Sequence, residues 1–427
     1  MTRAPILLAL VVVVASAGAG LVGADVRGGA LAGDGTVPPR AVGPGLFGGA
    51  APSGPGPGAD AVADRGGTDT VRVGVIGSSF GSAASLDGRV ADRYSVGSPR
   101  FGLVAGDHGT AVASVVAERT GDASLYLASV GYEPTPAEYD RAVRWLVAND
   151  VDVIVDAGSY YPRTADGMAR IAGAAERAAA AGVVFVTSGG NTARRHWRGT
   201  ADGTGWIAFD GDGTEGNRLG SGLIAGRVTL RLYWEGSADY DLYLYRDVPD
   251  GEDGVVAKST RESGHAEAID AVLPRGNYYV AVYARDPGDG PVDLFAARHT
   301  LGAAGANGSA VAPATAPGVI SVGALSADGG LASYSAADTD VRAPGTVRLD
   351  DGTSLRGTSA AAPAVASVVA EMTAAAGGDG LTPAEAERLL ERTADDGRVD
   401  PDAAVAAAGR TRTANQSDDG PVVYAGP

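Results

Sequence analysis

The sequence predicts an α/β fold, in which a parallel sheet flanked by helices is interrupted by an inserted all-β module. Buried-strand patterns alternate with helical patterns over residues 71–195, and the buried-strand pattern resumes at 317. Such alternation predicts a parallel sheet covered by helices. Over residues 205–300 apolar and polar residues alternate with a period of two. That pattern predicts a small β-sandwich.

The first alternating region contains the clearest single elements. Thr135 followed by Pro136 is typical of a helix start, because an N-cap residue precedes a proline at the first helical position. The expected strands are 71–76, 151–155 and 183–186, and the expected helices are 109–118, one beginning at Pro136, and 164–181. After the insert we expect a strand at 317–325 and helices at 359–375 and 383–394.

These patterns divide the chain into six segments. They are a signal peptide or N-terminal anchor (1–24), a Gly/Pro-rich linker (25–70), the first part of the α/β domain (71–204), the all-β insert (205–300), the second part of the α/β domain (301–410) and a polar tail (411–427).

Composition excludes several classes of function. The chain has no cysteine, which excludes disulfides, thiol catalysis and cysteine-based metal sites. Its formal net charge is −17, and Lys258 is the only lysine. An acidic surface of this kind is typical of halophilic proteins, since screening at high salt removes the self-repulsion of carboxylates. The same charge argues against nucleic acid as a partner.

The N-terminus has the pattern of an export signal. Arg3 precedes an almost wholly apolar stretch at 5–24, and small residues follow. We therefore expect an extracellular or cell-surface protein. The apolar stretch is also long enough to stay in a membrane, so anchoring through residues 5–24 is the alternative.

One motif near the C-terminus has the features of a nucleophile site. In RGTSAAAPAVAS (356–367), Ser359 precedes a run of small residues and then a buried helical pattern. This places Ser359 at a helix N-terminus, where free N–H groups and the helix dipole favour negative charge. Acyl transfer generates an oxyanion, so a serine nucleophile suits that position. The alternative is a serine that only caps the helix.

Four segments resemble motifs of the subtilisin-like serine proteases (subtilases), in that family's order. The segments are DHGTAVASVV (107–116), AGVVFVTSGGN (181–191), PGVISVGALSADGGLASYSAADTDVRAPG (317–345) and the GTSAAAP motif itself. The resemblance covers about 71–200 and 310–375, and it implies a subtilisin-like parallel sheet. It also implies that Ser359 is the nucleophile, His108 the general base and Asn191 the oxyanion-hole donor.

The strand segment IVDAG (154–158) is similar to the family's substrate-pairing strand. Gly158 fits the pattern and is expected to bind substrate, since close backbone approach favours glycine. Asp156 departs from the pattern, because the family usually has serine there.

The segment VGVIGSSF (73–80) is similar to the family's strand that ends in the triad aspartate, but Gly77 occupies that position. The site is therefore expected to lack the carboxylate that orients the histidine, at a cost of roughly 10⁴ in kcat. Three replacements are conceivable: a hydroxyl from Ser78 or Ser79, a carboxylate from Asp87 or Asp92, and Asp107. A phosphate loop is excluded, because no Gly-Lys-Ser/Thr follows.

Two functions remain open at this point. One is an exported subtilisin-like endopeptidase that hydrolyses protein or peptide substrates slowly, without the triad aspartate. The other is a catalytically silent pseudoprotease that acts as a surface binding protein.

No cofactor is required for either function. The insert resembles β-sandwich modules attached to secreted peptidases. There Asp239 and Asp241, with Asp247, Asp250 or Glu252, are candidate Ca²⁺ ligands. The alternative is that they are solvated turn acids.

Overall fold

The computed structural model describes residues 70–96, 107–378 and 380–418. The expected signal or anchor at 1–24 and nearly all of the expected linker lie outside the described residues. At the other end, helix α6 (Pro401–Asp418) extends into the segment expected to be a polar tail.

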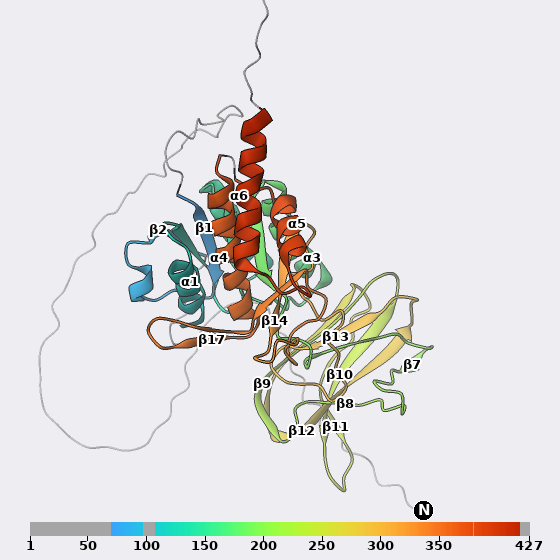
Figure 1. Cartoon of the computed structure of the whole chain (residues 1–427). Coiled ribbons are helices and arrows are strands. Elements are labelled where there is room, and N and C mark those ends of the chain that lie inside the picture. The colour runs from blue at the N-terminus through green and yellow to red at the C-terminus, as the bar shows by residue number, and fades with distance from the viewer. Residues whose placement is uncertain (1–69, 97–106, 379, 419–427) are drawn as a thin grey trace, which may run out of the picture. The chain divides into compact units, whose positions relative to one another are not determined.

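A seven-stranded sheet in which every neighbouring pair is parallel forms the centre of the α/β part (Figure 1). The strands follow the order β15-β14-β5-β4-β1-β3-β2. Their bounds are β1 (Arg72–Gly77), β2 (Val90–Ser95), β3 (Ser124–Ser129), β4 (Val153–Asp156), β5 (Val184–Ser188), β14 (Val319–Leu325) and β15 (Val341–Pro344). The expected α/β fold is therefore confirmed, with strands β2, β3 and β15 added to those expected.

Helices cover both faces of this sheet, and alternate residues along each strand face one layer or the other. Val73 and Val75 pack with α1 and α4, whereas Ile76 packs with α2 and α3. The helices are α1 (Asp107–Arg119), α2 (Pro136–Ala148), α3 (Ala165–Ala180), α4 (Thr358–Ala376) and α5 (Pro383–Thr393), with a short 3-10 helix at Ala84–Leu86. α2 begins as expected, with Thr135 and Glu138 forming a capping box.

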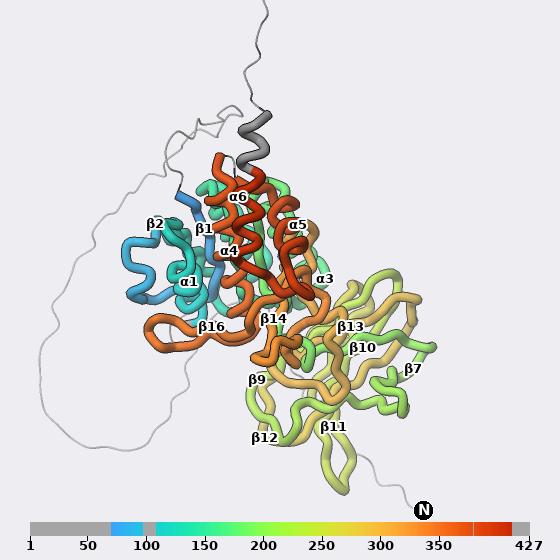
Figure 2. Tube along the Cα trace, in the orientation of Figure 1, coloured from blue at the N-terminus to red at the C-terminus, as the bar shows by residue number. Residues whose placement is uncertain are grey.

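The insert is antiparallel and has a hydrophobic core of its own. Figure 2 traces how the chain leaves the parallel sheet, forms the yellow-green insert and returns at β14. The long strand β12 pairs with β9 along its first half and with β10 along its second half. The insert's strands are β6 (His196–Gly199), β7 (Gly205–Trp206), β8 (Asn217–Arg218), β9 (Ile224–Trp234), β10 (Asp239–Asp247), β11 (Gly254–Ser259), β12 (Ala266–Asp286) and β13 (Val292–Ala296). Because β6 pairs with β13, antiparallel structure begins before the expected boundary at 205.

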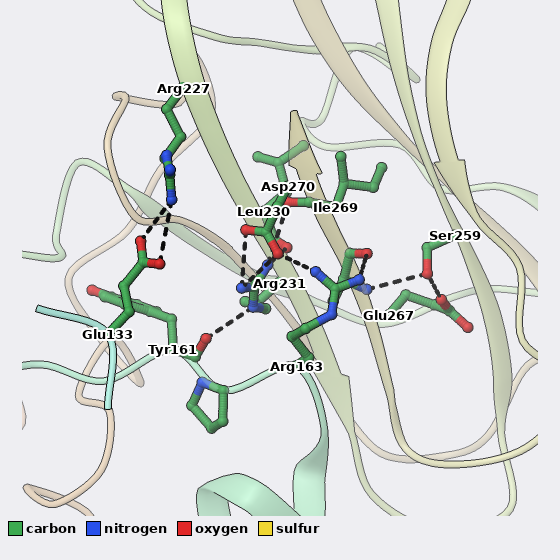
Figure 3. Close-up of polar contacts among 12 residues, drawn as sticks. Glu133, Tyr161, Arg163, Arg227, Leu230, Arg231, Ser259, Glu267, Ile269 and Asp270 are labelled. Carbon is green, nitrogen blue, oxygen red and sulfur yellow. Dashed lines mark hydrogen bonds and ion pairs between the residues drawn. The ribbon is translucent and has the colours of Figure 1, made fainter. Parts of the chain in front are cut away.

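A polar cluster joins the insert to the loop that precedes α3 (Figure 3). Arg231 of β9 is 5% exposed. Its guanidinium donates to the Tyr161 carbonyl at 2.9 Å and to both carboxylate oxygens of Asp270 at 3.1 Å. Arg163 also pairs with Asp270, and the Tyr233 hydroxyl donates to the Pro162 carbonyl at 2.6 Å. These acceptors satisfy the hydrogen-bonding needs of the buried Arg231 guanidinium. The contact between the insert and the loop therefore depends on these particular residues.

Within the described residues, α4 alone is long and apolar enough to span a membrane, but most of it is buried in the core. The remaining two strands, β16 (Thr346–Arg348) and β17 (Ser354–Arg356), form a hairpin just before α4.

Candidate active site

Ser359 lies in the first turn of α4 and is 8% exposed. Its hydroxyl donates to the carbonyl of Ala157 at 3.1 Å. Ala157 directly follows β4, so the serine lies at the carboxyl edge of the sheet, where α/β proteins gather their functional groups. In this state the hydroxyl is bound to the backbone.

Asn191 is held against the start of the same helix. Its Oδ1 accepts from the Thr358 amide at 3.0 Å and from the Thr358 hydroxyl at 3.3 Å. Since an asparagine amide has one oxygen acceptor and one NH₂ donor, the Nδ2 group remains available to donate. No feature of the sequence indicated this role for Thr358, although the residue is part of the serine motif.

Gly357 permits this close contact. Its φ is +90°, which a residue with a side chain rarely adopts. A Cβ at this position would lie 2.7 Å from Nδ2 of Asn191 and 2.8 Å from Oδ1. The glycine is therefore needed both for its backbone conformation and for the space that Asn191 occupies.

Gly77 ends β1 and faces α1. A Cβ added there would meet the Phe80 ring at 2.9 Å and the Cα of Gly109 at 3.1 Å. Gly109 is itself in close contact, since a Cβ on it would lie 2.3 Å from the Ser79 carbonyl oxygen. The Phe80 ring thus occupies the space that a side chain at position 77 would enter. No feature of the sequence indicated this role for Phe80.

Strand register brings His108 and Ser359 to the same part of the sheet edge. Ile76 of β1 is level with Asp156 of β4, so Gly77, which ends β1, and Ala157, which follows β4, both come directly after that pair. The helix of His108 abuts Gly77, while Ser359 hydrogen-bonds Ala157. Neighbouring strands are about 4.8 Å apart, so the two helix starts converge above adjacent strand ends.

His108 is exposed, but surrounding protein atoms desolvate its ring and lower the pKa of the imidazole from its ordinary value. Among the described residues, no hydrogen bond or ion pair involves this imidazole. It lines a groove of about 1010 Å³ between α1, residues 82–85 and the β16–β17 hairpin.

Within the described residues, Asp87, Asp92 and the Ser78 hydroxyl make no hydrogen bond or ion pair with His108. Asp87 is exposed, and Asp92, also exposed, accepts from the Arg93 amide. The Ser78 carbonyl accepts from the Ser129 hydroxyl at 2.9 Å, and no bond from the Ser78 hydroxyl to the histidine is found in the described part of the chain. The side chain of Asp107 lies outside the described residues.

Asp156 faces the opposite side of the sheet from His108 and Ser359. Its carboxylate is fully buried and accepts from the hydroxyls of Tyr139 at 2.8 Å and Tyr160 at 3.2 Å. Burial raises the pKa of Asp156 to about 6, although these hydrogen bonds oppose the shift. This carboxylate therefore supports the strand end and cannot replace the triad aspartate.

Gly158 is tied to the same cluster. Its amide donates to Asp156 Oδ1 at 2.8 Å, and its carbonyl accepts from the Ser188 hydroxyl at 3.0 Å. The amide expected to pair with a substrate is thus used internally in this structure. Neither Ser188 nor the two tyrosines were identified from the sequence.

The candidate Ca²⁺ ligands of the insert are dispersed or already paired. Asp241 is 3% exposed and accepts from the Tyr243 hydroxyl at 3.1 Å and from the Arg285 guanidinium at 2.6 Å. Within the described residues, no group of three or more acidic or histidine side chains is arranged to hold a metal ion.

Comparison with known proteins supports the fold. Residues 295–416 match the model of the Subtilase family, a stretch that includes Ser359 but neither Gly77, His108 nor Asn191. No curated protein sequence matches the chain. The structure resembles the Clostridium perfringens CspB protease with a TM-score of 0.58 at 15% identity, covering 80% of this chain and 95% of that chain.

Two further solved structures are similar at a lower level. They are a lanthipeptide protease (TM-score 0.45, 14% identity, 79% of this chain and 88% of that chain) and the nisin leader peptidase NisP of Lactococcus lactis (TM-score 0.43, 13% identity, 79% and 87%). The chain therefore has a subtilisin-like α/β fold, and its sequence matches the Subtilase family over residues 295–416.

Proposed function

We propose that the protein is an exported serine endopeptidase of the subtilisin type that works slowly, because no carboxylate among the described residues supports its histidine. In this proposal the Ser359 Oγ attacks the scissile carbonyl carbon and its proton passes to His108. The carbonyl oxygen takes the negative charge, and His108 then protonates the leaving amine. Water repeats the sequence on the acyl-enzyme, which regenerates the Ser359 hydroxyl.

The observation that carries this proposal is the hydrogen bond from the Thr358 amide to Asn191 Oδ1 at 3.0 Å. This bond fixes the side-chain amide of Asn191. Its Nδ2 group, which can only donate, then lies beside the N-terminus of α4. A fixed donor beside a helix N-terminus stabilises an oxyanion without reorganisation. Ser359 itself does not cap the helix, because the N-cap is Gly357, without a side-chain bond, and the Ser359 hydroxyl donates to Ala157.

A second candidate, a catalytically silent protein that binds peptides at the cell surface, has its own support. The Phe80 ring occupies the carboxylate's space, and the Ser359 hydroxyl is bound to Ala157 instead of the histidine. The groove beside His108 would suit an extended chain whether or not it is cut.

Fluorophosphonate labelling in high salt separates the two candidates. The probe forms a covalent bond with a serine only when that serine is activated as a nucleophile. We expect labelling of the natural protein and none in Ser359→Ala, with a large loss in His108→Ala. Ser367→Ala is a matched control, since it removes a serine hydroxyl from α4 that donates to the Pro363 carbonyl of the same helix and does not line the groove beside His108. No labelling of a natural protein that is folded by circular dichroism would refute the peptidase and favour the binding protein.

Export is part of the same proposal and rests on the apolar stretch at 5–24. The mass of the protein recovered from the producing cells tests it. Loss of about the first 24 residues would support a cleaved signal, while recovery of the full-length chain in membranes would support the anchor.

A further inference from the structure

The outer face of one sheet in the insert carries aromatic side chains where polar ones are usual. Along β10, Leu242 and Leu244 point into the core, whereas Tyr243 and Tyr245 alternate with them and are half-buried. On β12, Tyr279 lies directly opposite Tyr245. Antiparallel sheets normally present polar residues on the side that faces water, so a row of half-buried aromatics on that side indicates a binding surface.

Trp206 of β7 lies at the side of this row and is 38% exposed. Its ring centroid is 5.2 Å from that of Tyr243 and 6.4 Å from that of Tyr245, with the rings nearly perpendicular in both pairs. Tyr245 and Tyr279 stack at 5.1 Å. These aromatic contacts hold the indole upright beside a groove of about 440 Å³.

The polar lining of this groove is predominantly acidic. Glu215 and Asp247 line it together with Arg218. Arg218 donates to the Asn277 side chain at 3.2 Å. In the described part of the chain, neither carboxylate has a side-chain hydrogen bond or an ion pair with a basic residue. Two carboxylates beside aromatic faces form a region that attracts positive charge.

The same face already holds one guanidinium in this way. The Cζ of Arg285 lies 5.3 Å from the centroid of the Tyr283 ring, and its Nε donates to Asp241 at 2.6 Å. An aromatic ring and a carboxylate thus bind an arginine side chain at one end of the aromatic row. The groove at Trp206 repeats this combination of ring and carboxylate. Arg218 also lines it, but its guanidinium is bonded to Asn277, and no cation of the described chain is seated over the Trp206 ring.

We propose that this groove binds an arginine side chain of a partner peptide or protein, seated on Trp206 and neutralised by Glu215 and Asp247. Tryptophan is the best aromatic partner for a cation, and a guanidinium stacks on it while keeping its N–H groups free for carboxylates. This site lies on the insert and does not depend on the proposed peptidase activity.

Binding of acetyl-Gly-Arg-Gly-amide, followed by tryptophan fluorescence, tests the proposal. The control peptide has citrulline in place of arginine, which keeps the shape and removes the charge. We expect saturable binding of the arginine peptide alone. The Trp206→Phe variant assigns the signal, and the double variant Glu215→Gln with Asp247→Asn should weaken binding by at least about tenfold. Glu252→Gln, an exposed acid outside the groove lining, should leave binding unchanged.

Three results would overturn it. Equal binding of the citrulline peptide would show that charge is not recognised, and no binding by the folded protein would show that the groove is not an arginine site. Binding of a neutral oligosaccharide such as chitotriose at Trp206, unaffected by the double variant, would instead identify a carbohydrate site. Measurements belong at the lowest salt at which the protein stays folded, because salt screens an exposed ion pair.

Discussion

At the scale of single residues, Gly77 and Asp156 are the last residues of the neighbouring strands β1 and β4, but they face opposite sides of the sheet. Gly77 faces α1, the helix that carries His108, whereas the Asp156 carboxylate accepts from Tyr139 and Tyr160 on the other side of the sheet. The active-site face therefore has no carboxylate from either strand, while the far face buries one. Because side chains alternate along a strand, a shift of one position decides which layer receives the charge.

Asp156 makes stability depend on pH. Its folded pKa of about 6 exceeds its ordinary value of 3.8, so the folded protein holds the proton more tightly than the unfolded chain. Protonated Asp156 contributes at most about 3 kcal/mol to the free energy of unfolding. This contribution is complete below about pH 4 and is lost as the pH rises through 6. Urea unfolding from pH 4 to 7 should show that the natural protein loses stability relative to Asp156→Asn over that interval. Parallel pH profiles of the two proteins would contradict the burial argument.

The sequence predicted Ser359, His108, Asn191 and Gly77 as a set, because each lies in a continuous stretch that resembles a subtilase motif. It did not identify Phe80, since nothing local shows that a ring three residues after the strand turns back over the strand's end. Contacts such as Thr358 with Asn191 join segments far apart in the chain. Only the folded structure reveals which donor is left free.

At the scale of elements, the start of α4 combines a left-handed glycine with a close contact. Gly357→Ala should reduce the free energy of unfolding by about 1–3 kcal/mol, because it adds backbone strain and a methyl group against Asn191. It should also slow fluorophosphonate labelling of Ser359, because the Asn191 amide is displaced.

Gly352→Ala provides the matched control for that variant. Its φ is +85°, close to the +90° of Gly357, but a Cβ there meets nothing within 4 Å. The control therefore carries the backbone strain without the contact. Equal losses of stability and equal labelling rates in the two variants would show that the Asn191 contact is unimportant.

Local pattern predicted the elements that are buried or well capped. Strands β1, β4, β5 and β14 are almost continuously apolar, and α2 begins with a capping box.

β2 and β3 were missed for a physical reason. β2 (VADRYS) is an edge strand with mostly exposed side chains, and β3 (SLYLAS) contains serines and a tyrosine that weaken its apolar pattern. Pairing with β1, not local composition, determines β3.

At the scale of the whole molecule, the Arg231–Asp270 cluster links the insert to the α/β part. Asp270→Ala should reduce the free energy of unfolding by about 1–3 kcal/mol, because it leaves the buried guanidinium of Arg231 with fewer acceptors. The expected loss of stability is no larger than this because the Asp270 side chain is 36% exposed, so solvent screens its charge. Chemical denaturation measures the loss.

Glu133→Gln is the comparison for this contact. It removes the carboxylate that pairs with Arg227 and Arg298, but these side chains are about half exposed, so the loss should be below about 1 kcal/mol. A larger loss for Glu133→Gln than for Asp270→Ala would contradict the central role of the buried cluster. No local pattern indicated this link between the insert and the α/β part, since Arg231 and Tyr161 are 70 residues apart and Arg163 and Asp270 are 107 residues apart.

Restoring the missing carboxylate tests the proposal that this is a subtilisin-type site without the aspartate that supports the histidine. Phe80 must be reduced at the same time, because its ring meets any side chain at position 77. The measurement is kcat/KM on labelled casein for Gly77→Asp with Phe80→Ala against Gly77→Asn with Phe80→Ala, both checked for folding. We expect the aspartate variant to be faster by at least about a hundredfold. Equal rates in two folded variants would contradict it.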